Sequence, residues 1–250
     1  MSSSTTKSNP IIEIKNLSKS YGDNTVLNGF NLNLYEGENL VIMGKSGSGK
    51  SVMIKCLIGL EEPDGGTIKV MGKDINQIEH WELDELRTEI GFLFQGSALY
   101  DSMSVRENLE FPLRRHTKKF GKIKDTKPMV LEALTNVGLE DAIDMMPNEL
   151  SGGMKRRIAL ARTLILQPKI ILYDEPTTGL DPITSKEIIL LMMSIQKKYN
   201  TSSIIITHDV DCARVISNRM ILLIDNINYA EGTFGELSAS DDPKIKAFFK

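Results

Sequence analysis

Cysteine, a surplus of basic charge and long apolar segments are absent or scarce in this chain of 250 residues. Its two cysteines, Cys56 and Cys212, have no metal-ligand spacing, so we expect buried thiols, as suits a reducing cytoplasm. Lys and Arg number 30 against 33 Asp and Glu, which argues against nucleic acid as a partner. The longest apolar stretch, Ile188 to Ile195, is well short of the roughly 20 residues that cross a bilayer, so the chain is not itself a membrane channel.

The start of the chain is polar and lacks the apolar core of a signal peptide, so residues 1–10 are predicted to be a disordered tail. The chain is 41% hydrophobic and 25% charged, which allows one large domain or a core with a subdomain. The lysine-rich stretch from Lys118 to Lys127 is predicted to be a solvated loop or the start of a helix.

Short apolar segments indicate two kinds of β-structure. Residues 11–42 are predicted to form antiparallel strands, because Gly29 to Leu34 alternates apolar and polar residues. Two later strands, Ile170–Tyr173 and Ser203–Ile206, flank a helix-like segment at Thr184–Lys198, and this βαβ pattern predicts a parallel sheet buried on both faces. Further strands are predicted at residues 67–71, 90–94, 220–224 and 228–230, and helices between residues 96 and 161.

The most specific motif runs from Gly44 to Ser51 and matches the phosphate-loop pattern G-x-x-x-x-G-K-[ST] at every position. A predicted buried strand precedes it and a predicted helix follows it, so backbone N–H groups can surround an anion at a helix N-terminus. We expect Lys50 to reach the β- and γ-phosphates and the Ser51 hydroxyl to ligate Mg²⁺. The predicted phosphate-binding residues are Gly44, Lys45, Ser46, Gly47, Ser48, Gly49, Lys50 and Ser51.

Four further candidates stand at the carboxyl ends of predicted strands, the edge of an α/β sheet where ligands bind. Asp174 is expected to hold Mg²⁺ opposite Ser51, and Glu175 to activate a water as general base. His208 is expected to contact the γ-phosphate, and the Gln95 amide to reach Mg²⁺ or the attacking water. An acidic turn after a strand is common, so the functional interpretation of Asp174 and Glu175 depends on the phosphate loop upstream.

A second anion site is predicted where Leu150–Met154 precedes a helix over Lys155–Leu166. Ser151 or Gly152 can cap this helix and leave free N–H groups at the positive end of its dipole. One nucleotide occupies one phosphate loop, so a second such site suggests the γ-phosphate held by a partner subunit.

With these residues in this order, the chain resembles the nucleotide-binding subunits of ABC transporters from about Ile11 to Leu237. The resemblance implies ATP and Mg²⁺ as ligands and a homodimer that holds two ATP molecules head to tail. It implies that Tyr21 stacks on adenine and that Ser151, Gly152 and Gly153 form the signature. It further implies a D-loop that contains Asp181, catalytic roles for Glu175, His208, Gln95 and Lys50, and Ser51, Gln95 and Asp174 as metal ligands.

The resemblance also implies an α/β fold. A P-loop (RecA-like) core with a mainly parallel sheet would carry an N-terminal antiparallel β subdomain and an inserted α-helical subdomain. Residues 11–240 would form a single ATPase domain, with 11–95 and 162–240 as catalytic core and 96–161 as helical subdomain. Residues 241–250 are predicted to form a short helix, in which Phe248 and Phe249 pack rather than dock a partner.

The signature ends in Met154, where the family commonly has glutamine. In this feature, and in the segments Leu93–Val105 and Phe111–Arg114, the chain is similar to the ATPases of Mla-type phospholipid transporters, which work with MCE-domain proteins. This likeness implies a peripheral motor on the cytoplasmic face of the inner membrane, attached to integral permease subunits and acting with an MCE-domain lipid-binding protein.

Three alternatives are open. A motor for another ABC importer or exporter, for amino acids or lipoproteins, would use the same catalytic residues. A soluble ABC protein of DNA repair or translation usually has a long coiled-coil insertion or tandem ATPase halves, and the sequence has neither. A nucleotide kinase would not need the signature or Gln95.

Overall fold

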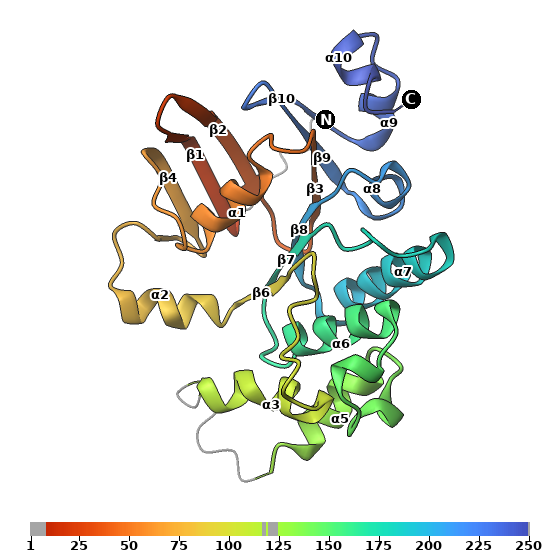
Figure 1. The fold of residues 1–250 in the computed structure, drawn as a ribbon. Coiled ribbons are helices and arrows are strands. Elements are labelled where there is room, and N and C mark those ends of the chain that lie inside the picture. The colour runs from red at the N-terminus through yellow and green to blue at the C-terminus, as the bar shows by residue number, and fades with distance from the viewer. Residues whose placement is uncertain (1–8, 117–118, 120–124, 250) are drawn as a thin grey trace, which may run out of the picture.

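The computed structural model describes residues 9–116, 119 and 125–249. Most of the predicted tail over residues 1–10, and most of the stretch Lys118–Lys127, therefore lie outside the described residues. The described part of the chain contains two sheets with helices packed around them (Figure 1). None of its helices is both long enough and apolar enough to cross a membrane.

The larger sheet has six strands in the order β10-β9-β3-β8-β7-β6. All neighbours pair in parallel except β10, and helix α7 (Pro182–Tyr199) connects β7 to β8 as the βαβ pattern predicted. The strands are β3 (Asn39–Gly44), β6 (Ile90–Leu93), β7 (Ile170–Asp174), β8 (Ser202–Ile206), β9 (Arg219–Ile224) and β10 (Ile227–Gly232).

The prediction of antiparallel strands throughout residues 11–42 is wrong for β3, which pairs in parallel with β8 and β9. The physical reason is its burial on both faces, which favours a continuous apolar segment over alternation. Leu40 and Ile42 belong to a core cluster with helix α1 (Lys50–Leu57) and the smaller sheet. Val41 and Met43 belong to a second cluster with α7 and with helices α6 (Gly152–Leu164) and α8 (Val210–Ile216).

The smaller sheet is antiparallel, as predicted for the N-terminal region, and has the order β2-β1-β4-β5. Its strands are β1 (Ile12–Tyr21), β2 (Asn24–Leu34), β4 (Gly65–Val70) and β5 (Lys73–Asp74). Arg219 of β9 ties the two sheets together. It donates to both carboxylate oxygens of Glu38 at 2.8 and 2.9 Å, pairs with Glu231, and donates to the carbonyl of Asn33 in β2.

Helix α2 (His80–Arg87) precedes β6, and a helical region with a core of its own follows β6. This region contains α3 (Val105–Arg115), α5 (Lys127–Thr135), the 3₁₀ turns η1 (Glu140–Ala142) and η2 (Pro147–Glu149), and α6. Figure 1 shows α3 and α5 at the end of the molecule away from the smaller sheet. Helix α6 spans the predicted boundary at residue 161, so the helical region and the larger sheet share one continuous helix.

The chain closes with α9 (Phe234–Ser238) and α10 (Pro243–Lys246), and Asp242 caps α10. The last helix is thus shorter than the predicted residues 241–250. Phe248 and Phe249 pack against the second core cluster, and the Phe249 ring meets Phe234 edge-on at 5.4 Å, as expected for packed rather than docking side chains.

Both cysteines are buried and unpaired, as predicted. Burial raises the pKa of Cys56 to about 11 and that of Cys212 to about 12. Because the thiolate is the reactive form, we expect neither thiol of the native protein to react with dithionitrobenzoate near pH 8, and both to react in guanidinium chloride. A native thiol that reacts as fast as free cysteine would contradict this burial.

Candidate active site

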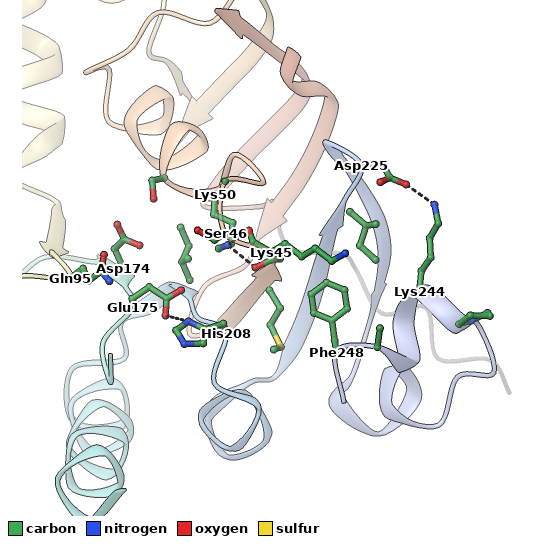
Figure 2. A pocket seen from close by; sticks show the side chains of 18 residues that line it. Lys45, Ser46, Lys50, Gln95, Asp174, Glu175, His208, Asp225, Lys244 and Phe248 are labelled. Atoms are coloured by element: carbon green, nitrogen blue, oxygen red, sulfur yellow. Dashed lines mark hydrogen bonds and ion pairs between the residues drawn. The ribbon is translucent and has the colours of Figure 1, made fainter. Parts of the chain in front are cut away.

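The carboxyl ends of β3, β6, β7 and β8 meet at one cavity of about 900 Å³ (Figure 2). The strand register brings these ends together, because Leu93, Tyr173, Ile205 and Val41 form one row across the four strands. Polar residues that follow this row therefore reach the same edge. Among the residues predicted from sequence, the cavity is lined by Gly44, Lys45, Ser46, Gly47, Lys50, Ser51, Gln95, Asp174, Glu175 and His208.

The phosphate loop joins β3 to α1 and leaves the first amides of α1 without a side-chain cap. Such free N–H groups at a helix N-terminus form an anion site. Gly49 stands at the N-cap with φ 97°, and a Cβ there would lie 2.6 Å from the Val26 carbonyl oxygen. Gly49 does not line the cavity, and neither does Ser48. The Ser48 hydroxyl is buried and has no hydrogen-bond partner among the described residues.

The Lys50 amine lies inside the loop, where Nζ donates to the carbonyls of Gly44 at 2.7 Å and Lys45 at 2.9 Å. Burial lowers the pKa of Lys50, and the carboxylates of Glu175 and Asp174 oppose this shift. The amine is thus held among loop carbonyls and faces the two carboxylates across the cavity (Figure 2).

Oxygen ligands for a cation gather around Asp174 at the end of β7. Burial raises the pKa of Asp174 and so does the neighbouring Glu175, whereas Lys50 and a hydrogen bond from the Ser51 hydroxyl lower it. The Gln95 amide lines the same cavity. A hydroxyl, a carboxylate and an amide oxygen are hard ligands of the type that Mg²⁺ takes in proteins, so these residues fit the predicted cation.

Glu175 is held by three contacts in a left-handed backbone conformation, φ 50°. Its N–H donates to the Ile206 carbonyl at 2.9 Å, and its Oε2 lies 2.8 Å from His208 Nδ1. The same Oε2 accepts a hydrogen bond from Thr178 Oγ1 at 3.1 Å. A carboxylate fixed beside a phosphate loop can serve as general base, and strained backbone is common at such sites.

Besides Ser48 and Gly49, five predicted residues do not line this cavity. Tyr21 ends β1 with 46% of its surface exposed, and Asp181 caps α7 by accepting from the N–H groups of Ile183 and Thr184, each at 3.0 Å. The other three form the predicted signature. Ser151 caps α6, since its Oγ accepts from the Met154 N–H at 3.2 Å, and Gly152 and Gly153 start the helix.

Glycine at position 153 has a packing reason, because a Cβ there would lie 2.7 Å from Thr184 Cγ2 on α7. The N-terminus of α6 therefore sits close against the start of α7, and its signature residues do not line the cavity of the chain's own phosphate loop. A single copy holds only part of the predicted site.

Sequence reasoning missed one wall of the cavity and one hydrogen bond to a residue that lines it. Asp225, Lys244 and Phe248 line the side next to Lys45, and Lys244 Nζ pairs with Asp225 Oδ2 at 2.6 Å (Figure 2). No motif in the sequence marks this wall, which depends on how the C-terminal helices fold back. Thr178 was also missed, although its place three residues after Glu175 is a local signal.

The family model for ABC transporters matches residues 27–178 of the chain. The chain belongs to the ABC transporter family. It is therefore an ATP-hydrolysing subunit, as predicted. A solved dimeric ATP-binding cassette in a post-hydrolysis state, bound to ADP and Pi, has a TM-score of 0.80 at 34% identity and covers 89% of this chain and 98% of its own. The predicted α/β P-loop fold is thereby confirmed.

Relatives within the ABC family carry names of different transport systems. A probable ribonucleotide transport ATP-binding protein of Mycobacterium leprae is 41% identical over 95% of this chain and 68% of its own length. The intermembrane phospholipid transport system ATP-binding protein of Haemophilus influenzae is 39% identical over 96% and 90%. A methionine import ATP-binding protein of Clostridium tetani is 39% identical over 94% and 73%.

Gly44 offers a test of the loop geometry. A Cβ at this position would lie 2.5 Å from Ser48 Oγ and 2.8 Å from the Leu223 carbonyl oxygen. We expect Gly44→Ala to shift the loop and weaken equilibrium binding of ATP by about tenfold or more, as a loss of fitted anion contacts does. Gly235→Ala, where nothing lies within 4 Å of the new Cβ, is the control and should bind ATP normally. Equal affinities would contradict the tight fit.

Proposed function

We propose that this chain is the ATPase motor of a membrane ABC transporter that moves phospholipid between membranes of the cell envelope. The observation that carries the proposal is the match to the intermembrane phospholipid ATPase, which includes 90% of that relative's length. The methionine and ribonucleotide relatives are matched over 73% and 68% of theirs. The Met154 signature and the segment Leu93–Val105 point the same way.

In the proposed mechanism, Lys50 and the amides of the phosphate loop bind the β- and γ-phosphates of ATP. Ser51, Gln95 and Asp174 would hold Mg²⁺, which supplies charge neutralisation at the phosphates when bound. Glu175 takes a proton from the attacking water, and His208 stabilises charge on the γ-phosphate. The Thr178 hydroxyl keeps the Glu175 carboxylate in place through its 3.1 Å hydrogen bond.

A second copy of the chain would complete each site. Ser151, Gly152 and Gly153 are proposed to bind the γ-phosphate held by the partner copy, with Asp181 at the seam and Tyr21 against adenine. Support comes from their position outside the cavity of one copy and from the dimeric form of the related cassettes. ATP binding would close the homodimer and hydrolysis would reopen it.

The proposed partners are integral permease subunits and an MCE-domain lipid-binding protein. The helical region and residues 100–108 are proposed to bind the permease. The motor would then sit peripherally on the cytoplasmic face of the inner membrane. The second candidate is a motor for another substrate, which the 41% identity to a ribonucleotide transport ATPase favours.

Glu175→Gln is expected to keep ATP binding and to lower kcat by about 100-fold or more, because an amide cannot accept the proton of water. Trapped ATP should then hold two copies together, which light scattering detects as a dimer. Near-normal turnover would exclude Glu175 as the base, and a monomer at saturating ATP would contradict the sandwich of two copies.

The substrate assignment is tested by a tagged pull-down from detergent-solubilised membranes, with mass spectrometry of bound proteins and lipids. We expect a multi-span permease, an MCE-domain protein and phospholipid. Recovery of a permease with neither an MCE-domain protein nor phospholipid would support the ATPase mechanism and contradict phospholipid as the substrate. Recovery of no membrane protein would contradict the transporter assignment.

A further inference from the structure

Arg156 is a buried cation in the middle of α6, with 4% of its surface exposed. No carboxylate among the described residues forms an ion pair with it, and its Nε has no hydrogen-bond partner there. Burial lowers the pKa of its guanidinium. An unpaired buried charge lowers the stability of a protein, and an apolar side chain of similar size would avoid this cost. Packing alone therefore does not explain an arginine at this position.

The two hydrogen bonds of Arg156 join two loops of the active site. Nη1 donates to the carbonyl of Phe94 at 2.8 Å, and Nη2 donates to the carbonyl of Thr178 at 3.3 Å. Phe94 directly precedes Gln95. Thr178 donates through its hydroxyl to Glu175, which in turn pairs with His208. One planar guanidinium thus fixes the distance between the backbone beside Gln95 and the backbone that holds Glu175.

The loop around Gln95 depends on donors from α6. Ser97 and Ala98 adopt positive φ values of 62° and 50°, which non-glycine residues rarely take without support. Arg162 supports both, since it donates to the Ser97 carbonyl at 3.1 Å and the Ala98 carbonyl at 2.8 Å. These bonds stay within that loop. Arg156 is the donor that also reaches the segment after β7, so it links the two halves of the site.

We propose that Arg156 is a positioning residue for ATP hydrolysis, which holds Gln95 and Glu175 in register with each other across the cavity. The proposal rests on the functions proposed above for Gln95 and Glu175. Arg156 has a role separate from the loop proposed to bind ATP, because among the described residues its hydrogen bonds go to Phe94 and Thr178 and those of the Lys50 amine go to Gly44 and Lys45. Loss of the guanidinium should therefore reduce turnover and leave ATP affinity intact.

The test uses the purified full chain with the variants Arg156→Met and Arg156→Lys. We expect Arg156→Met to lower kcat by about tenfold or more while equilibrium binding of ATP stays within about twofold, the pattern of a lost transition-state contact. Arg156→Lys, which can reach one carbonyl, should retain part of the activity. Arg87→Met is the matched control, because Arg87 of α2 also donates to two backbone carbonyls, those of Ile58 and Gly59, each at 3.0 Å, and lies outside the candidate site and the helical region. It should match the wild type.

A double variant separates positioning from general loosening. Thr178→Val removes the hydroxyl that Glu175 accepts from, so if Arg156 acts through Thr178, the two losses should not multiply. We expect kcat of the double variant to lie within about threefold of kcat of the less active single variant. Three results would each overturn the proposal. The losses of kcat could multiply fully in the double variant, kcat of Arg156→Met could lie within about twofold of the wild type, or ATP binding could be lost together with kcat.

Two further measurements keep the result interpretable. Thermal unfolding is followed for every variant, and if Arg156→Met is unfolded, Arg156→Lys decides by the same split between kcat and ATP binding. Glu175→Gln is assayed in parallel. If that variant keeps normal turnover, the proposed function of Glu175 fails; if it is inactive and Arg156→Met is normal, the positioning proposal alone fails.

Discussion

The candidate active site depends on the register of four parallel strands. Because β6, β7, β8 and β3 are aligned row by row, their carboxyl ends deliver Gln95, Asp174, His208 and Gly44 to one cavity. A shift of one residue in any strand would turn its side chains to the opposite face of the sheet. The two apolar clusters on either face oppose such a shift, so the packing of the sheet and the geometry of the site are one constraint.

The residues predicted from sequence are those whose position follows from local rules. A phosphate loop needs glycines between a strand and a helix, and polar side chains just after buried strands must gather at one sheet edge. The lysine at position 50 and the carboxylates at 174 and 175 could be found in this way, and they lie at the cavity. The parallel pairing of β3 could not, because strand direction is set by distant partners, and the sequence alternation next to it suggested the wrong neighbour.

The rest of the site depends on contacts that are remote in sequence. Lys244 and Phe248 reach the cavity only because α9 and α10 fold back over β10, and the Lys244–Asp225 ion pair spans 19 residues of chain. The Arg156 bonds span 62 residues to Phe94 and 22 to Thr178, and they end on backbone carbonyls, which carry no side-chain signature. Motif reasoning finds side chains that act on a ligand, and it does not find those that hold other residues.

Helix α6 connects the two kinds of contact. Its N-terminus, capped by Ser151, carries the residues proposed to meet the partner's nucleotide, and its middle and last turns donate to the loop around Gln95. A helix transmits displacement along its length because its backbone hydrogen bonds resist local distortion. If the N-terminus of α6 moves as two copies close, the helix would therefore also displace the backbone at Phe94, Ser97 and Ala98 of the same chain. The proposed closure at one site and the proposed arrangement of catalytic groups at the other would then be coupled through α6, the helix whose residues belong to the cores of both the helical region and the larger sheet.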